Sequence, residues 1–424
     1  MSAFARDFRE DRDINLGVGY VNENTIPREL VIEALQYVLA HPAKYRTALN
    51  YGRPRGSANL IDSIRQYHLQ HRIGGLSEET LRKQTIIIGP NGATSLLEGL
   101  ASVLRKGIVL TTDPMYYIYC NFLERSGFTV VTIPESDHGL EAAALQEKLG
   151  QLGDACRKIS CVYVVTVNNP TGTILANTER RGLVTAVSNL SKKLGRSVPL
   201  VFDKAYEGLV HDPRVEALES GLLGDEMGIV YEIGTLSKIL APALRIGFMM
   251  GREGPLLCAM VQKTSDAGFS APLINQEMAS YLLDHHVEAQ AERVRVGYRT
   301  KALALRGWID EYLGDSIARR TGGQAGFYFY LTLVGIHTTE RSPFFRFLTR
   351  TTGDDATDGV PPSRNPRVIY IPGEFCVHPQ GSLVEEGRRQ LRISYGFEES
   401  DRIRDALGHM QAAAAYARTV STTP

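Results

Sequence analysis

The chain has 424 residues, more than one hydrophobic core usually holds, so two domains are expected. Hydrophobic residues make up 43% of it and charged residues 22%, as in an ordinary soluble globular protein. The 47 basic and 47 acidic side chains cancel, which argues against nucleic acid or an anionic membrane surface as the main partner.

Short apolar runs alternate with helical patterns through the middle of the chain. These patterns predict strands at residues 85–88, 107–111, 128–133, 161–166, 199–202 and 228–232, and a helix at 95–104. Runs rich in β-branched residues and separated by helices indicate an α/β fold with a mostly parallel central sheet and helices on both faces. Ligands of such sheets bind beyond the carboxyl ends of the strands, so polar clusters that follow the strands are candidate site residues.

The pattern changes after about residue 287. A charged helix is predicted at 288–309 and strands at 326–333 and 392–395, which indicates a smaller α+β domain. Residues 351–366 are rich in Gly, Asp, Thr and Pro and are predicted to form a mobile loop.

The first polar cluster, Gly-Pro-Asn-Gly-Ala-Thr-Ser at residues 89–95, lies between a predicted strand and a predicted helix. Small residues at a helix start leave backbone N–H groups free to hold an anion, with help from the helix dipole. A tight turn with a threonine or serine cap is the commoner explanation of such a junction. The cluster matches neither the Walker loop nor the dinucleotide fingerprint.

Two further clusters follow predicted strands. Residues 113–119 place several aromatic side chains at a strand exit, where one ring could stack on a flat heteroaromatic cofactor, although aromatic clusters more often belong to a core or an interface. Residues 167–173 contain Asn-Pro-Thr-Gly, a turn that presents an amide side chain in a rigid geometry at the end of a buried strand.

A carboxylate, Asp203, stands at the end of another buried strand, with the phenol of Tyr206 three residues later. A carboxylate there is costly unless it is hydrogen-bonded or paired with a cation, and a protonated pyridine nitrogen is such a cation. The alternative is that Asp203 caps the next helix.

Lys238 is set among small and hydroxylated residues in the run from 234 to 247, just after an apolar strand-like stretch. This position suits a Schiff base, which needs an unprotonated amine and hence burial or a cationic neighbour that lowers the pKa. Arg245, seven residues on, could be that neighbour and could also bind a phosphate.

A single arginine, Arg392, lies in the apolar strand predicted near the C-terminus. A guanidinium in that setting needs a bidentate carboxylate partner. The partner is either an internal Asp or Glu or the carboxylate of a substrate.

Taken in this order, the clusters resemble those of the pyridoxal-phosphate enzymes of the aspartate aminotransferase superfamily, fold type I. The resemblance runs from about Leu16 to the last helix. The segment Thr-x-Ser-Lys-x-x-x-Pro-x-Leu-Arg-x-Gly at residues 235–247 is most similar to the 2-aminoadipate and MocR-like branch.

The resemblance implies pyridoxal 5'-phosphate as the cofactor. It implies that Lys238 carries the cofactor as a Schiff base and moves the proton at the reacting carbon, while Asp203 keeps the pyridine nitrogen protonated. Asn169 and Tyr206 would hydrogen-bond the phenolic oxygen, and Tyr116 would stack on the ring. The residues implied to hold the phosphate are Gly92, Ala93, Thr94, Thr235, Ser237 and Arg245.

Substrate contacts and an assembly are also implied. Arg392 matches the arginine that binds the substrate α-carboxylate, with Asn169 and the backbone around Gly19 close to the substrate. Tyr51 matches a tyrosine that reaches the phosphate in the neighbouring subunit, which implies a homodimer with shared active sites. The implied domains are an N-terminal segment (1–50) that covers the site and joins the small domain, a large cofactor-binding domain (51–290) and a small domain (291–424).

The implied reaction moves an amino group from an L-amino acid to a 2-oxo acid. Because a fold does not fix reaction type, a lyase, decarboxylase or oxidase acting on an amino acid is the alternative. An α-oxoamine synthase typically has histidines at the positions of Tyr116 and Tyr206, so these tyrosines argue against it. A MocR-like regulator would carry a helix-turn-helix ahead of this fold, and no segment fits one.

Residues 17–27 begin like the strip that covers the substrate in this family, but they lack the proline that commonly follows the glycine. We expect this strip and the 351–366 loop to lie near the entrance of the site. Tyr20, Asn22 and Glu23 are then expected to shape selectivity for the substrate side chain, the alternative being that the strip is merely surface. No second clear arginine is present for a distal carboxylate.

Cellular location is predicted from what the sequence lacks. No apolar stretch is long enough to span a bilayer, and the first residues lack the core of a signal peptide. The five cysteines form no CxxC pair and are odd in number, so reduced thiols and a cytoplasmic protein are expected. The ten histidines are scattered, and no metal site is predicted.

Overall fold

Seven strands form the central sheet of the computed structural model, which describes residues 8–360 and 364–421. Their order across the sheet is β2 (Gln84–Ile88), β8 (Gly247–Arg252), β7 (Val230–Thr235), β6 (Leu200–Asp203), β5 (Ile159–Val165), β3 (Ile108–Asp113) and β4 (Thr129–Pro134). Neighbouring strands are parallel except where β8 pairs with β2 and β7. The predicted mostly parallel sheet is confirmed.

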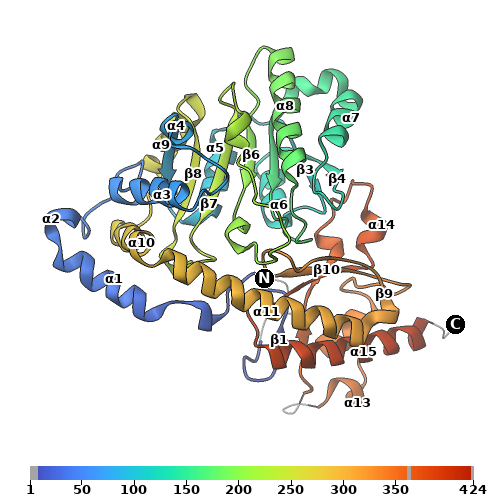
Figure 1. The fold of residues 1–424 in the computed structure, drawn as a ribbon. Coiled ribbons are helices and arrows are strands. Elements are labelled where there is room, and N and C mark those ends of the chain that lie inside the picture. The colour runs from blue at the N-terminus through green and yellow to red at the C-terminus, as the bar shows by residue number, and fades with distance from the viewer. Residues whose placement is uncertain (1–7, 361–363, 422–424) are drawn as a thin grey trace.

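Helices cover both faces of this sheet, as Figure 1 shows. One face packs against α5 (Gly92–Val103), α6 (Tyr117–Arg125) and α9 (Pro255–Asp266). The other packs against α3 (Ala58–Gln70), α7 (Ala142–Leu152), α8 (Asn177–Leu194) and α10 (Leu273–His285). Burial on both faces explains why strands such as β5 are mostly apolar and do not alternate between apolar and polar residues.

The antiparallel strand β8 is absent from the predicted elements. It contains two glycines and two methionines but no β-branched residue, so it lacks the composition by which the other strands are recognised. Pairing with β2 and β7 forms this strand despite its weak intrinsic preference.

A second, antiparallel sheet has the order β12 (Ile371–Pro372), β13 (Gln390–Ser394), β10 (Tyr328–Leu333) and β9 (Ile317–Gly322). Near it lie α11 (Val287–Leu313), α12 (Pro343–Thr349), α14 (Val384–Gly387) and α15 (Ser400–Ser421), as Figure 1 shows. The predicted helix 288–309 and strands 326–333 and 392–395 correspond to α11, β10 and β13. Because α11 is continuous across residue 290, the domain boundary expected there falls within a helix, and the division into domains stays a prediction.

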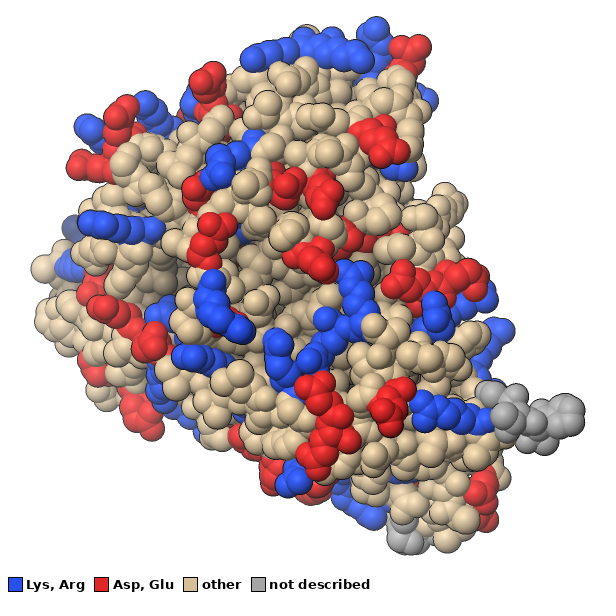
Figure 2. Space-filling view, turned by 45° about the vertical axis from the view of Figure 1, so that its right-hand side comes forward, with Lys and Arg blue, Asp and Glu red and all other residues tan. Residues whose placement is uncertain are grey.

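The N-terminal part of the chain contacts elements that surround the first sheet and elements that surround the second. β1 (Ile14–Asn15) pairs in parallel with β11 (Val368–Ile369), and α1 (Arg28–Ala40) then runs along α10. The remaining short helices are α2 (Pro42–Tyr45), α4 (Glu78–Arg82) and α13 (Asp355–Asp358). No helix within the described ranges has both the length and the apolar character needed to cross a bilayer. Figure 2 shows basic and acidic side chains interspersed over one face of the molecule.

Candidate functional site

Polar side chains from several strand ends meet in one cavity of about 440 Å³. Tyr116 follows β3, Asn169 follows β5, Asp203 ends β6 and Thr235 ends β7. Because these strands are parallel, their carboxyl ends share one edge of the sheet, which is where the sequence predicts a site. The other predicted residues that line this cavity are Gly19, Ala93, Thr94, Tyr206, Ser237, Lys238 and Arg245.

Lys238 projects into this cavity from the turn that follows β7. Its Nζ donates a hydrogen bond to the Gly19 carbonyl oxygen at 3.0 Å. Burial, with smaller effects from the cations Arg245 and Arg392, lowers the pKa of Lys238 from its ordinary value to about 8. An amine with this pKa is partly unprotonated near neutral pH, so it can act as a nucleophile or a base.

Asp203 is the buried acid of the cavity. One carboxylate oxygen accepts from the Tyr163 hydroxyl at 2.8 Å, and the other accepts from the backbone N–H of Ala205 at 3.0 Å. Burial raises the pKa of Asp203, against these hydrogen bonds. No basic side chain among the described residues lies within ion-pair distance of it. The helical turn at 207–209 has no side-chain cap, so the alternative that Asp203 caps it is wrong.

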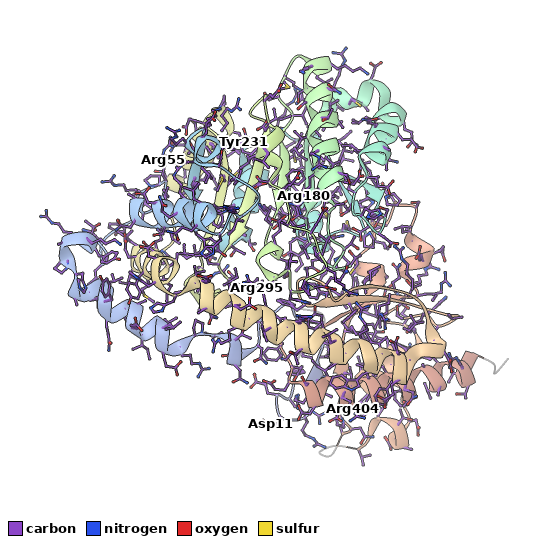
Figure 3. The ribbon with its side chains drawn as sticks, viewed as in Figure 1. Asp11, Arg55, Arg180, Tyr231, Arg295 and Arg404 are labelled. Carbon is purple, nitrogen blue, oxygen red and sulfur yellow. The ribbon has the colours of Figure 1, made fainter. Side chains whose placement is uncertain are left out.

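Lys204, the next residue, shows why Asp203 lacks a cation. Its Nζ lies 2.9 Å from Glu232 and 3.1 Å from Glu207. Arg180 of α8, which Figure 3 labels, also pairs with Glu207. The side chains of neighbouring residues in a strand point to opposite faces, so the lysine is neutralised in this network while Asp203 faces the cavity alone.

A cradle for an anion lies at the start of α5. Gly92 has a φ of 68°, a left-handed conformation that glycine adopts without strain, and its N–H donates to the Arg245 carbonyl. The N–H groups of the next residues are in the first helical turn, where the helix offers no acceptor. Asn91 precedes the helix without a cap from its own side chain, but Ser95 Oγ accepts from the Asn91 N–H at 2.8 Å, so a serine hydroxyl closes this turn as the alternative expected. Thr235 and Ser237 add hydroxyls that are 2.9 Å apart.

Arg392 is buried in β13 and reaches the same site from the second sheet. One terminal nitrogen donates to Asn169 Oδ1 at 2.6 Å, the other donates to the Gly17 carbonyl, and Nε has no partner among the described residues. Within the described ranges no acidic side chain pairs with Arg392, which disfavours the internal carboxylate left open by the sequence. Its guanidinium lies over the Tyr328 ring, 4.4 Å from the centroid.

A larger cavity of about 1090 Å³ adjoins the first and contains Arg392. Lys238, Asn169 and Tyr206 line both cavities. The walls that only the larger cavity has include aromatic and apolar side chains, namely Tyr117, Ile118, Tyr328, Ile369, Ile371 and Phe397. A group bound beside Lys238 would therefore have room for a bulky side chain next to Arg392.

Gly92 and Tyr51 are the predicted residues that line neither cavity; Gly92 directly precedes Ala93, which lines the smaller one, whereas Tyr51 lies on the surface. It is 82% exposed, and its ring contacts that of Phe269 at a centroid distance of 5.8 Å. Nearby Leu49 is 80% exposed. Two large side chains left in solvent on one loop mark a surface suited to contact with another protein.

The N-terminal strip lies at the entrance as expected, but Asn22 has a structural role there. Its side chain accepts from the Asn24 N–H and donates to the Phe397 carbonyl and to Glu399. We expect Asn22→Ala to lower the free energy of unfolding by about 1–3 kcal/mol, because a buried cap and two donated bonds are lost. The ranking of amino-acid substrates should stay unchanged.

The control for this prediction is Tyr20→Ala. Tyr20 is 60% exposed and lines both cavities, so its loss should change the substrate ranking with little effect on stability. Denaturant unfolding and a panel of amino acids measure both properties. If Asn22→Ala changes the substrate ranking and Tyr20→Ala does not, the structural role of Asn22 is contradicted.

The segment 351–366 does not lie where the sequence suggests. Its described residues line neither cavity. Asp358, at the end of α13, accepts hydrogen bonds from Thr352 and Gly353, and Asn365 and Pro366 lie near Arg9 and Arg350. Residues 361–363, on which part of the mobile-loop prediction falls, lie outside the described residues.

Glu135, just after β4, braces the Asn-Pro-Thr-Gly turn. It accepts from Asn168 Nδ2 at 2.8 Å, and Asn168 also donates to the Pro114 carbonyl. Burial raises the pKa of Glu135 to about 7, although hydrogen bonds from Asn168 and the hydroxyls of Thr171 and Thr173 oppose this rise. The folded state therefore favours the protonated form, and stability falls as pH rises from about 4.5 through 7.

We expect Glu135→Gln to remove part of this fall. The free energy of unfolding of the variant minus that of the unmodified protein should increase by about 1–3 kcal/mol when the pH is raised from 5 to 8. A residual decline should persist, because burial also raises the pKa of Asp113 to about 6. Denaturant unfolding at the two pH values measures the gain, and equal pH dependence in both proteins would contradict it.

Two tyrosines of the site were missed by sequence reasoning. Tyr163 donates to Asp203, and Tyr328 contacts Tyr206 and Arg392. Both lie in predicted strands. A phenol inside an apolar strand needs a partner for its hydroxyl, and this signal could have marked both residues as neighbours of a polar site.

Comparison with known proteins identifies relatives of the chain. Residues 11–333 match the model of the family described as aminotransferase class I and II. A 2-aminoadipate transaminase of Thermus thermophilus is 27% identical over 310 residues, which cover 72% of each chain. An uncharacterised HTH-type transcriptional regulator of Bacillus subtilis, YisV, is 24% identical over 322 residues, or 75% of this chain. The match spans only 61% of the regulator's length.

Solved structures share the fold. The kynurenine aminotransferase of Pyrococcus horikoshii superposes with a TM-score of 0.79 at 23% identity, over 98% of this chain and 96% of that one. The α-aminoadipate aminotransferase LysN of Thermus thermophilus, complexed with N-(5'-phosphopyridoxyl)-L-leucine, gives a TM-score of 0.76 at 22% identity, over 99% and 96%.

Proposed function

The chain belongs to the class I and II aminotransferase family, and we propose that it is a pyridoxal-phosphate-dependent aminotransferase that transfers an amino group from an L-amino acid to a 2-oxo acid. The observation that carries this proposal is a lysine of lowered pKa in one cavity with a buried carboxylate that has no cation. Lys238 and Asp203 are the groups that such a cofactor needs at its two ends.

The cavity fits pyridoxal phosphate by charge and by hydrogen-bonding capacity. Lys238, Arg245 and Arg392 are cations with no carboxylate within 4 Å in the described part of the chain. A doubly charged phosphate and a substrate carboxylate would neutralise them. The Asp203 carboxylate would gain the cation that it lacks from a protonated ring nitrogen. The start of α5, with Thr235, Ser237 and Arg245, would hold the phosphate.

When bound, the cofactor supplies a ring that accepts the electron pair left behind when the substrate Cα loses its proton. Lys238 would take up that proton and return it, which its partly neutral amine allows. Asn169 and Tyr206 would donate hydrogen bonds to the phenolic oxygen, and Tyr116 would hold the ring plane.

Arg392 would orient the substrate by its α-carboxylate. The guanidinium is already fixed by Asn169, Gly17 and the Tyr328 ring, so binding would cost little ordering of the side chain. Its unpartnered Nε supports this role, because a buried donor without an acceptor is costly. Gly19, whose carbonyl accepts from Lys238, would help to exclude water above the reacting carbon.

A homodimer with shared sites is part of the proposal. One side of α1 leaves Ile32, Leu35 and Leu39 exposed at helical spacing, and Leu49 and Tyr51 extend this apolar surface. A second copy that covers this surface would bring Tyr51 to the phosphate of its partner. All five cysteines are free thiols, which supports a reducing compartment such as the cytoplasm.

The test is a single-turnover absorbance scan of the protein loaded with pyridoxal phosphate. It is mixed separately with each common L-amino acid, without any oxo acid. Conversion of the cofactor to its amine form, with release of the matching 2-oxo acid, is expected for one or a few amino acids. Release of carbon dioxide, ammonia or hydrogen peroxide instead would favour the alternative of decarboxylase, lyase or oxidase chemistry.

A further inference from the structure

Tyr328 lies on β10 of the second sheet, yet its side chain touches several residues of the proposed site. Its hydroxyl is 2.8 Å from the Tyr206 hydroxyl, and its ring lies beneath the Arg392 guanidinium. A Cβ at Gly19 would come within 2.6 Å of the Tyr328 hydroxyl, so the glycine leaves the space that this oxygen fills. Only 1% of Tyr328 is exposed, and it lines the larger cavity together with Lys238.

The two hydroxyls can share their hydrogen bond in either direction, so the donor follows from their surroundings. Burial raises the pKa of both phenols. The permanent cation of Arg392, 4.4 Å from the Tyr328 ring centroid, is the main opposing effect on the pKa of Tyr328. It also lowers the pKa of Tyr206, but there Tyr328 and Tyr116 have larger effects that raise the pKa further. The more acidic phenol of a neutral pair is the better donor, which makes Tyr328 the donor and Tyr206 the acceptor.

We propose that Tyr328 is a positioning residue that donates to the Tyr206 oxygen, directs the Tyr206 hydrogen into the cavity, and supports Arg392 with its ring. The inference rests on the proposed function, because the acceptor in the cavity would be the phenolic oxygen of the cofactor. Donation into Tyr206 also polarises its own hydroxyl, so that it becomes a stronger donor. One side chain thus connects the cofactor contact with the substrate contact.

Tyr330 provides a matched control on the same strand. It is also buried, and its hydroxyl donates to Gln390 at 3.0 Å, but it lines neither cavity of the site. Tyr328→Phe and Tyr330→Phe therefore remove the same group from equally buried positions. A merely structural role of the Tyr328 hydroxyl would give both variants the same properties apart from stability.

The first measurement follows the absorbance of the bound cofactor with pH. In Tyr328→Phe the Tyr206 hydroxyl is a weaker donor to the phenolic oxygen, so more negative charge remains there to hold the proton of the neighbouring nitrogen. We expect the spectral transition to move to higher pH by about half a unit or more, the size that one neutral hydrogen bond can supply. Tyr330→Phe should leave the transition in place.

The second measurement separates the ring from the hydroxyl. Tyr328→Phe keeps the ring under Arg392, so the KM for the amino acid should change by less than about twofold. Tyr328→Leu removes the ring, and the KM should rise at least about fivefold, with a smaller change in kcat. Equal KM values in Tyr328→Leu and the unmodified protein would overturn the support of Arg392.

The third measurement needs no cofactor. In the cofactor-free protein, Tyr206→Phe, Tyr328→Phe and the double variant are compared by denaturant unfolding. Because one hydrogen bond joins the hydroxyls, the double variant should lose less stability than the two single losses added together. Additive losses, or a spectral transition unmoved in Tyr328→Phe, would overturn the proposal. If the unmodified protein develops no cofactor absorbance, the proposed function fails, and this comparison still tests the hydroxyl pair.

Discussion

Lys238→Ala is expected to lower the rate of transamination at least about 10⁴-fold, because one substitution removes both the nucleophile that holds the cofactor and the base that moves the proton. The protein should still fold, since the only hydrogen bond that Lys238 donates within the described part of the chain is to the Gly19 carbonyl. It should also still bind pyridoxal phosphate without a covalent bond, because the start of α5 and Arg245 remain. Single-turnover absorbance and equilibrium dialysis measure the two effects.

Lys106→Ala is the matched control, because this lysine also donates to a backbone carbonyl, that of Ala101, but lies over the Phe128 ring, away from the cavities. It should keep full activity. The lowered pKa of Lys238 gives a second result in the unmodified protein. Covalent capture of pyridoxal phosphate should speed up roughly fivefold from pH 7 to pH 8 and level off near pH 9, since only the neutral amine reacts. A rate that keeps rising above pH 10 would contradict the lowered pKa.

The parallel part of the fold was predictable because its strands carry their own signal. β5 and β3 are buried along their whole length and rich in apolar residues, a pattern typical of strands covered on both faces, and the polar residues that end or follow them mark the ligand-binding edge. The same signal fails for β8, whose glycines and methionines form a strand only through pairing with β2 and β7.

The site residues on a single strand end were predictable, but the contacts between distant segments were not. Asp203 stands out as a charge after an apolar run, whereas its donor Tyr163 lies 40 residues earlier, inside the preceding strand β5, where it has the appearance of a core residue. Asn22 has the residue type of a selectivity determinant, yet its amide group donates hydrogen bonds to the Phe397 carbonyl and to Glu399, near the C-terminal end of the sequence. Such pairings depend on tertiary packing, which no local pattern encodes.

The charges of the site share one property, which is that they lack partners of opposite charge in the described part of the chain. Among the described residues, Lys238, Arg245 and Arg392 face the site without an acidic partner and the buried acid Asp203 faces it without a cation, although the chain as a whole is neutral. Asp203, Lys238 and Arg392 would each be costly to bury alone. Burial of each charge becomes favourable when a ligand with a phosphate, a carboxylate and a protonated ring nitrogen is present. These residues therefore lower the stability of the empty protein and raise the affinity for the ligand.

Asp203→Asn tests this reasoning because its two expected effects have opposite signs. With the cofactor bound, the rate should fall at least about 100-fold, because the charge that keeps the ring nitrogen protonated is gone while the shape and the bond from Tyr163 remain. In the cofactor-free protein, the free energy of unfolding should rise at pH values above the raised pKa of Asp203. Burial raises the pKa of Asp203, so the ionised form costs folding free energy as pH rises through that raised value, and asparagine removes this cost.

Asp225→Asn is the matched control for this comparison. Asp225 is also a buried acid, but its carboxylate accepts from the backbone N–H groups of Ile229 and Val230, away from the cavities. Its replacement should lower stability and leave the rate unchanged. If Asp203→Asn instead lowered stability in the same way and its rate loss matched the fraction of unfolded protein, Asp203 would be a structural acid. If Asp203→Asn is more stable without the cofactor and also slower with the cofactor bound, Asp203 serves the ligand at the expense of stability.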